Sequence, residues 1–137
     1  MIDELSWLGG IWDGEGTIGI YKRKTYFVPS VSVSNTNEVL INKVKDILDF
    51  YNIEYYVEYS DRGNRTNARP AWAIKMESKP RVSKFLSLIK PYLIAKQGQA
   101  DLVLSWCSSD KRRKELSTKD VEIMTELKSL NSRGRVK

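Results

Sequence analysis

Apolar and polar residues follow different periods along the chain, and each change of period marks the border of a predicted element. Apolar residues recur at helical spacing over 4–13 and then alternate with polar residues over 17–24 and 27–34. This pattern predicts a helix followed by a hairpin of two strands. Thr36 or Asn37 caps the next predicted helix, whose apolar residues again return every third or fourth position.

The second half of the chain repeats the order of a strand pair followed by a helix. Strands are predicted over 55–60 and 70–76, with a polar loop between them. Pro70 at the start of the second strand suits a position at the edge of a sheet. Ser78 is the predicted N-cap of the helix that follows, which ends before Pro91.

Helices are also predicted over 97–106 and from the Ser117–Thr118 cap onward, and approximately residues 131–137 are expected to form a flexible basic tail. The order of elements is therefore α-β-β-α-β-β-α followed by C-terminal helices. This order predicts an α+β fold with a twisted antiparallel sheet. The length of 137 residues fits a single domain, 1–137, that is large enough for a hydrophobic core.

Composition narrows the chemistry that this domain can perform. The chain has no histidine, which excludes Ser-His and Cys-His nucleophilic catalysis and zinc fingers of the Cys/His type. Any catalysis must therefore use carboxylates, lysine and a hard metal ion. The net charge of +6 favours a polyanionic partner, nucleic acid before an acidic membrane.

Cysteine content and hydropathy bear on the compartment. The single cysteine, Cys107, excludes an internal disulfide and suggests a reducing environment. The sequence shows neither a cleavable signal sequence nor an apolar run of membrane-spanning length. We therefore expect an intracellular protein without membrane association, in the cytoplasm of a prokaryote or in an organelle.

The segment WLGGIWDGEG, residues 7–16, sets three glycines into an apolar helical run that ends at two acids. Glycine inside a helix costs up to about 1 kcal/mol relative to alanine, so these glycines need a packing reason. Ser6, Gly10 and Gly14 recur every fourth residue and form a face on which a second helix can pack closely. The expected partner is the same helix of a second copy, which would bring two copies of Glu15 together. The predicted dimer interface comprises Ser6, Gly9, Gly10, Asp13 and Gly14.

Residues 8–16, LGGIWDGEG, resemble the nine-residue signature of the LAGLIDADG homing endonucleases. Residues 93–104, LIAKQGQADLVL, are similar to that family's stretch around an active-site lysine, and the predicted order of elements is that of its core. The resemblance extends over about the whole chain. A single copy of the motif implies a homodimer rather than a monomer with two motifs. Asp13 matches the first acid of the signature, where we expect it to end the helix rather than to bind metal.

The resemblance implies a role for each further residue that matches. Glu15 stands at the family's metal-binding acid, and the Gly14 carbonyl stands where a backbone oxygen also reaches the metal. Lys96 matches the lysine near the scissile phosphate, with Gln97 beside it. Asn35 stands where the family often has a glutamine that orients water. The implied metal is Mg²⁺ or Mn²⁺, with Ca²⁺ as a non-cleaving substitute.

Alternation also predicts which side chains leave the sheet on the side opposite the core. If Ile18, Val31 and Ile74 point inward, their neighbours in each strand point outward. A twisted antiparallel sheet can lie in the major groove of DNA, and the resemblance implies a reading surface of the same parity. The residues predicted to read bases are Gly19, Tyr21, Arg23, Ser30, Ser32, Ser34, Glu58, Ser60, Arg62, Ala71, Ala73 and Lys75. The residues predicted to contact phosphates are Lys22, Lys24, Arg65, Arg69, Lys111, Arg112 and Arg113.

Together these observations predict a sequence-specific double-stranded DNA endonuclease, an intron-encoded homing endonuclease that hydrolyses phosphodiester bonds with a divalent metal. It is expected to act as a homodimer on a long pseudo-palindromic site. Two alternatives stay open. The same scaffold can serve as an RNA-splicing maturase with intron RNA as its partner, or as a DNA-binding regulator that does not cleave.

Overall fold

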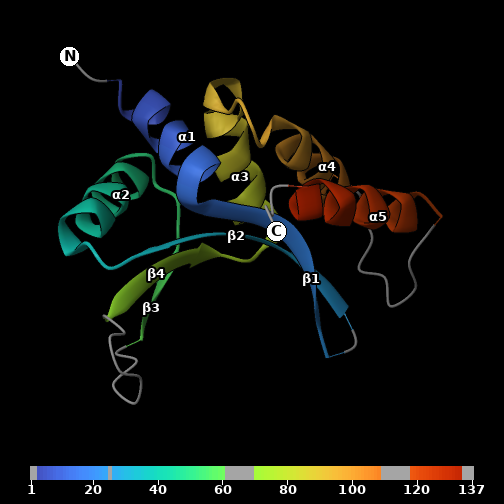
Figure 1. Cartoon of the computed structure of the whole chain (residues 1–137), viewed down its shortest axis with the longest axis horizontal. Coiled ribbons are helices and arrows are strands. Elements are labelled where there is room, and N and C mark those ends of the chain that lie inside the picture. The colour runs from blue at the N-terminus through green and yellow to red at the C-terminus, as the bar shows by residue number, and fades with distance from the viewer. Residues whose placement is uncertain (1–2, 25, 61–69, 109–117, 134–137) are drawn as a thin grey trace.

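The computed structural model describes residues 3–24, 26–60, 70–108 and 118–133 (Figure 1). Its elements follow the order expected from the sequence, with a short 3-10 helix, η1, added before the fourth α-helix. None of the described helices is both long and apolar enough to cross a membrane. The elements are α1 (Glu4–Glu15), β1 (Gly16–Arg23), β2 (Tyr26–Asn35), α2 (Glu38–Phe50), β3 (Tyr56–Ser60), β4 (Ala71–Met76), α3 (Lys79–Ile89), η1 (Lys90–Tyr92), α4 (Gln97–Cys107) and α5 (Thr118–Arg133).

In the described part of the chain, the strands form a four-stranded antiparallel sheet in the order β1-β2-β4-β3. The predicted α+β class with an antiparallel sheet is therefore confirmed. β4 lies between β2 and β3, so the expectation that Pro70 marks an edge strand is wrong. Pro70 precedes the first residue of β4, where the ladder does not require its missing N–H.

The helices pack on one face of the sheet, and the described elements leave the opposite, curved face uncovered (Figure 1). α1, α2 and α3 lie over the strands, and α4 and α5 extend the helical layer alongside β1. The molecule therefore has a helical side that holds the core and a sheet side that a ligand can approach.

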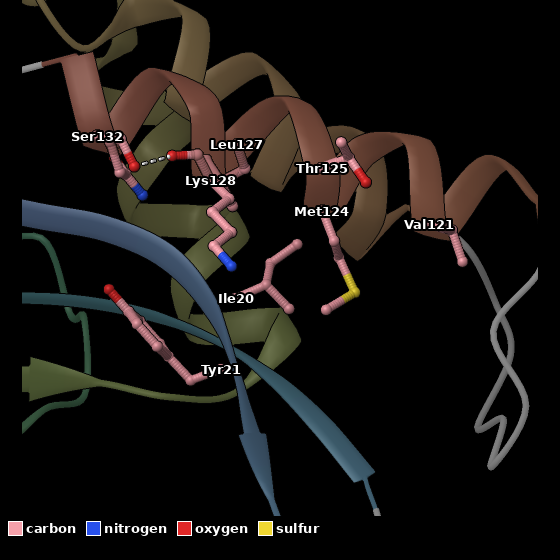
Figure 2. Close-up of a pocket in the computed structure, with 9 residues that line it drawn as sticks. Ile20, Tyr21, Val121, Met124, Thr125, Leu127, Lys128 and Ser132 are labelled. Atoms are coloured by element: carbon pink, nitrogen blue, oxygen red, sulfur yellow. Dashed lines mark hydrogen bonds between the residues drawn. The ribbon is translucent and has the colours of Figure 1, made fainter.

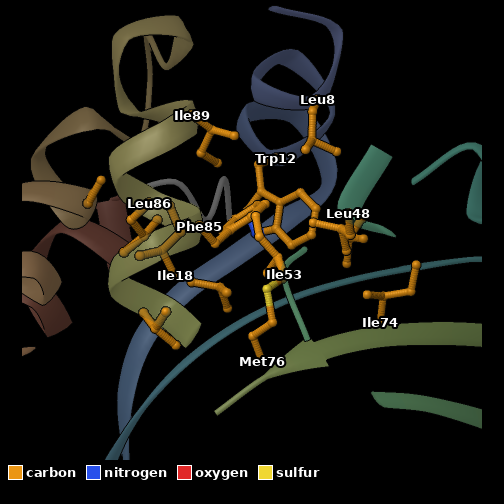
Figure 3. Packing of buried hydrophobic residues seen from close by; sticks show 14 of the residues in the cluster. Leu8, Trp12, Ile18, Leu48, Ile53, Ile74, Met76, Phe85, Leu86 and Ile89 are labelled. Atoms are coloured by element: carbon orange, nitrogen blue, oxygen red, sulfur yellow. The ribbon is translucent and has the colours of Figure 1, made fainter. Parts of the chain in front are cut away.

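The core lies between the helices and the inner face of the sheet (Figure 3). Trp12 of α1 is fully buried and packs on Phe85 of α3, with ring centroids 4.5 Å apart. Trp12 Nε1 also donates to the Thr17 carbonyl oxygen at 3.3 Å, which ties the end of α1 to the start of β1. The predicted alternation in the strands is confirmed, because their inward residues are at most 1% exposed: Ile18, Val31, Val33, Ile74 and Met76.

The C-terminal helix is longer than expected. α5 continues to Arg133, two residues past the approximate start that was expected for the basic tail. Asn131 Nδ2 donates to the Ile18 carbonyl oxygen at 3.2 Å, and Asn131 Oδ1 accepts from Gln99 Nε2 at 3.4 Å. These bonds hold the last turns of α5 against β1 and α4. Residues 134–137 lie outside the described residues.

Gly9 lies where α1 approaches η1. A Cβ added at Gly9 would lie 2.7 Å from Tyr92 Cβ and 3.1 Å from the Tyr92 carbonyl oxygen. Any larger residue would therefore push α1 away from η1. The prediction that Gly9 belongs to a dimer interface is corrected, because this glycine is buried and packs within its own chain.

Candidate active site

Glu15 lies at the junction between the first helix and the sheet. It is the last residue of α1, is exposed, and is followed directly by β1. Its Oε2 accepts a hydrogen bond from Asn35 Nδ2 at 2.8 Å, and Asn35 Oδ1 accepts from the Asn37 backbone N–H at 2.7 Å. The second bond fixes the direction in which the Asn35 amide faces. The structure thus brings Glu15 and Asn35, two predicted site residues, into direct contact.

Lys96 approaches the same helix end from the start of α4. Its Nζ donates to the carbonyl oxygens of Trp12 at 3.1 Å and Asp13 at 2.6 Å. The last carbonyls of a helix lack partners within the helix and carry partial negative charge, so an ammonium group there stabilises them. Burial lowers the pKa of Lys96, and the nearby Asp13 carboxylate opposes that shift. The structure therefore places the Lys96 ammonium group at the C-terminal end of α1, where it binds backbone carbonyl groups of that helix.

The Asp13 carboxylate binds the segment before α4 in return. It accepts hydrogen bonds from the backbone N–H groups of Ile94 at 2.6 Å, Ala95 at 3.1 Å and Lys96 at 2.9 Å. The expectation that Asp13 ends the helix is corrected, because α1 continues past Asp13 to Glu15. The Asp13 carboxylate is engaged within its own chain. We call the bonds of Asp13 and Lys96 together the α1–α4 clamp.

The rest of the predicted dimer face is open. Ser6, Gly10 and Gly14 are exposed, and apart from the adjoining residues and backbone of α1 itself, no heavy atom of the described residues lies within 4 Å of a Cβ placed at either glycine. In contrast to Gly9, no packing contact within the described residues explains why these two positions are glycine. The face therefore remains available to a second helix.

The donors that this junction offers a metal ion are oxygens, the Glu15 carboxylate and the Gly14 carbonyl. Hard divalent cations prefer such ligands, and the negative end of α1 adds a favourable field. Among the described residues, no group of three or more His, Cys, Asp or Glu side chains could hold a metal. One chain thus supplies only some of the ligands that a metal ion needs, and the others would come from a second copy, water or phosphate. Gln97 does not join this set, because its Nε2 donates to the Lys90 carbonyl oxygen at 3.3 Å.

The uncovered face of the sheet carries polar side chains that bond across the strands. Their parity is the predicted one, since they alternate with the buried residues of the core. Such bonds hold donors and acceptors in fixed positions before any ligand arrives. The pairs are Thr17 with Ser32 at 2.7 Å, Lys75 with Glu58 at 3.0 Å, and Arg23 with Glu77 at 2.6 Å.

Three residues predicted to read DNA are buried in the chain. Gly19 is covered by Tyr21, since a Cβ at Gly19 would lie 2.7 Å from the Tyr21 hydroxyl oxygen. Ser30 pairs with Gly19 in the ladder and is 5% exposed. Ala71 is 7% exposed, because its methyl group on an inner strand is too short to rise above its neighbours. The alternation therefore predicted the correct side of the sheet for these three residues. It did not predict that longer side chains around them would bury them.

The other residues of the predicted DNA surface divide by exposure. The exposed ones are Tyr21, Lys22, Arg23, Lys24, Ser34, Glu58 and Ser60, and the half-buried ones are Ser32, Ala73 and Lys75. Three further residues lie on this face and were not predicted from the sequence, although each continues the alternation of a strand by two positions: Thr17, Tyr56 and Glu77. Six predicted residues lie outside the described residues: Arg62, Arg65, Arg69, Lys111, Arg112 and Arg113.

A cleft of about 490 Å³ lies between β1 and α5. Figure 2 shows Ile20 pointing toward α5, whereas the Tyr21 ring lies on the other side of β1. Met124 and Lys128 of α5 also line the cleft, and none of its lining residues belongs to the Glu15 junction. The cleft is therefore separate from the candidate active site.

A comparison with known families agrees with the fold. The model of the LAGLIDADG-like domain family matches residues 3–90, and the chain belongs to this family. The chain is also 41% identical over 61 residues to the uncharacterized protein MJ0314 of Methanocaldococcus jannaschii. That match covers 44% of this chain and 23% of MJ0314, so the chain matches less than a quarter of this curated relative.

Solved structures of homing endonucleases share the fold at low identity. I-CvuI in complex with its target in the presence of 2 mM Ca matches with a TM-score of 0.66 and 21% identity, over 98% of this chain and 83% of that chain. I-AabMI bound to uncleaved DNA matches with a TM-score of 0.65 and 17% identity, over 93% of this chain and 44% of that chain. I-SmaMI bound to cleaved DNA matches with a TM-score of 0.64 and 18% identity, over 97% of this chain and 48% of that chain. These likenesses show that the chain has the LAGLIDADG homing endonuclease fold.

We predict that Asp13→Ala lowers the free energy of unfolding by about 1–3 kcal/mol, because three backbone N–H groups lose a charged acceptor. Asp13→Asn keeps one acceptor oxygen and should lose less. Urea denaturation followed by circular dichroism measures the change. Glu126→Ala, which removes an exposed carboxylate on α5, is the control and should stay within about 0.5 kcal/mol of the wild type. Equal stability of Asp13→Ala and the wild type would contradict the clamp.

Proposed function

We propose that the protein is a metal-dependent, sequence-specific DNA endonuclease that acts as a homodimer. The observation that carries this proposal is the Glu15 carboxylate, which is exposed at the negative end of α1 and is oriented by Asn35. An acid at the negative end of a helix is unfavourable for the helix itself. A cation bound from outside would compensate for that cost, which gives this carboxylate a functional reason.

Properties of the chain and of its relatives support DNA as the substrate. The net charge of +6 suits a polyanion, and the uncovered sheet face offers donors and acceptors that can meet base edges in the major groove. I-CvuI is described in complex with a DNA target in the presence of 2 mM Mg, where the DNA is not cleaved, and in complex with its own target in the presence of 2 mM Ca, whereas I-SmaMI is described bound to cleaved DNA. Carried over to this chain, all of these complexes support DNA as the partner, and the cleaved DNA of the I-SmaMI complex supports cleavage.

Each residue of the junction has a role in this proposal. The Glu15 carboxylate and the Gly14 carbonyl would hold Mg²⁺ or Mn²⁺, which neutralises phosphoryl charge and lowers the pKa of bound water. Asn35 keeps the Glu15 carboxylate in place through its Nδ2. Lys96 has three N–H donors, and its bonds to the carbonyls of α1 leave the third for a phosphate oxygen. Gln97 Nε2 donates to the Lys90 carbonyl oxygen, so we assign Gln97 no direct role at the metal.

The open face of small residues on α1 supports the proposed homodimer. One chain offers one carboxylate at the junction, whereas cleavage of a duplex needs a site for each strand. Two copies packed through Ser6, Gly10 and Gly14 would place two Glu15 carboxylates side by side, since these residues lie on the same helix. The spacing of the two helices would then determine which two phosphates are cut.

We predict that the protein linearises a plasmid carrying its insertion-site sequence in Mg²⁺ and leaves it intact in EDTA. Glu15→Gln removes the charge of the metal ligand and should slow cleavage at least about 100-fold, as agarose gels of single-turnover reactions will measure. Glu126→Gln, an exposed acid on α5, is the matched control and should cleave normally. Specific binding without cleavage in Mg²⁺ would favour a DNA-binding regulator, and promotion of intron splicing without DNA cleavage would favour a maturase.

We predict that Gly10→Leu separates the dimer into folded monomers, because a branched side chain would hold the two α1 helices apart. Sedimentation equilibrium at micromolar concentration measures the association, and circular dichroism checks the fold. Ser87→Leu adds the same bulk at an exposed position of α3 and should leave the dimer intact. A wild-type monomer at this concentration, or a Gly10→Leu dimer as tight as the wild type, would contradict the proposed interface.

A further inference from the structure

Glu77 lies on the uncovered face of the sheet, where side chains from all three other strands converge on it. It follows the last residue of β4. Its Oε2 accepts a hydrogen bond from Arg23 Nη2 of β1 at 2.6 Å, and its Oε1 accepts from the Tyr56 hydroxyl of β3. Ser30 of β2 also forms a side-chain hydrogen bond with Glu77. These contacts link the tip of the β1–β2 hairpin to the opposite edge of the sheet.

The contacts keep Glu77 ionised at neutral pH. Partial burial favours the neutral acid, but the hydrogen bonds from Tyr56 and Arg23 outweigh burial and lower the pKa of Glu77. Burial and the bond to Glu77 raise the pKa of Tyr56 to about 12, so its hydroxyl stays a donor. The bond between Arg23 and Glu77 is therefore a charge-assisted one, which is stronger than a neutral hydrogen bond.

Arg23 is held from a second direction by Tyr21. The Arg23 guanidinium carbon lies 5.9 Å from the centroid of the Tyr21 ring, and the ring itself lies back over Gly19. Gly19 makes this possible, since any Cβ there would meet the Tyr21 hydroxyl at 2.7 Å. The Arg23 side chain is 45% exposed and that of Glu77 is 20% exposed. The arginine is thus the partner that a ligand can reach, and the carboxylate is the partner that holds it.

We infer that Glu77 is a positioning residue that holds Arg23 ready to read a guanine in the major groove, an inference that rests on the proposed function. A guanidinium group has five N–H donors in a rigid plane, so the bond to Glu77 leaves donors for guanine O6 and N7. Both Glu77 oxygens are already engaged, and Glu77 therefore acts through Arg23 rather than on a base. Holding the long side chain in advance reduces the rotamer freedom lost on binding.

The test is selection of binding sites by the whole protein from a DNA duplex library with a randomised central segment, in Ca²⁺. The wild type should enrich a guanine at one position of each half-site. Arg23→Lys keeps the charge but not the planar fork, and should lose this preference at least about fivefold. Glu77→Gln should weaken the same preference and leave the others in place. Glu54→Gln is the control, because it makes the same change in charge but removes the ion-pair partner of Arg81, away from this cluster. It should retain the guanine preference.

Binding to a duplex of unrelated sequence gives a second readout. Glu77→Gln releases Arg23 from its carboxylate, so the dependence of log affinity on log salt should steepen by up to about 0.9 per protomer. Glu54→Gln should show a smaller change, because Arg81 lies outside the sheet face. If Glu77→Gln does not fold, as judged by circular dichroism, Tyr56→Phe removes one bond to Glu77 without changing charge and should weaken the guanine preference less.

The outcomes separate the inference from the function on which it rests. Retention of the guanine preference in Arg23→Lys would show that Arg23 is not the reader and would overturn the inference. Loss of the preference in Arg23→Lys but not in either Glu77→Gln or Tyr56→Phe would show that Glu77 does not position it. A wild type that enriches no sequence at all would instead refute the proposed sequence-specific function, and the inference with it.

Discussion

The α1–α4 clamp is the interaction on which the candidate site depends. A helix end leaves carbonyl groups without partners, and the turn before another helix leaves N–H groups without partners. Lys96 and Asp13 satisfy both sets in one place, because the ammonium binds the carbonyls of α1 and the carboxylate binds the N–H groups of 94–96. α1 passes into β1 without a loop. The clamp therefore fixes Glu15 and the first strand together, and it relates the candidate metal site to the sheet.

The sheet gives the molecule two faces with different tasks. Its inner face carries the apolar side chains that bury Trp12 and Phe85, and this packing holds α1 and α3 in place. Its outer face carries paired polar groups. The acids there, Glu58 and Glu77, each contact a basic side chain, so the face does not repel phosphate as isolated carboxylates would. A basic protein can thus keep acidic residues on a surface proposed to meet DNA.

Local patterns predicted most of the fold, because strands and helix caps depend on neighbouring residues. Asn37 and Ser78 are N-caps in the structure, and the alternation around Ile18 and Ile74 gave the buried face of the sheet. The hydrophobic pattern could not predict the order of the strands in the sheet, because that order depends on which strands pair. Pro70 suggested an edge because the sequence does not show that β3 pairs on the far side of β4.

The candidate site could be predicted only where a motif or strand parity marked it. Glu15 lies in the nine-residue signature, and the expected position of Asn35 matches its contact with Glu15. The role of Asp13 was missed because its partners are more than eighty residues away along the chain. Gly9 and Gly10 are identical in type, and only the position of Tyr92 shows that one faces inward and the other outward.

The central claim, that the end of α1 is a metal site, is tested most directly by Mn²⁺ titration of the isotope-labelled whole chain with NMR detection. Paramagnetic broadening should appear first in the amide signals of Gly14, Glu15 and Asn35. Glu15→Gln should abolish that preference while the remaining spectrum stays folded. Broadening that favours other acids, such as Glu126 on α5, or that is the same with and without the Glu15 carboxylate, would contradict the account.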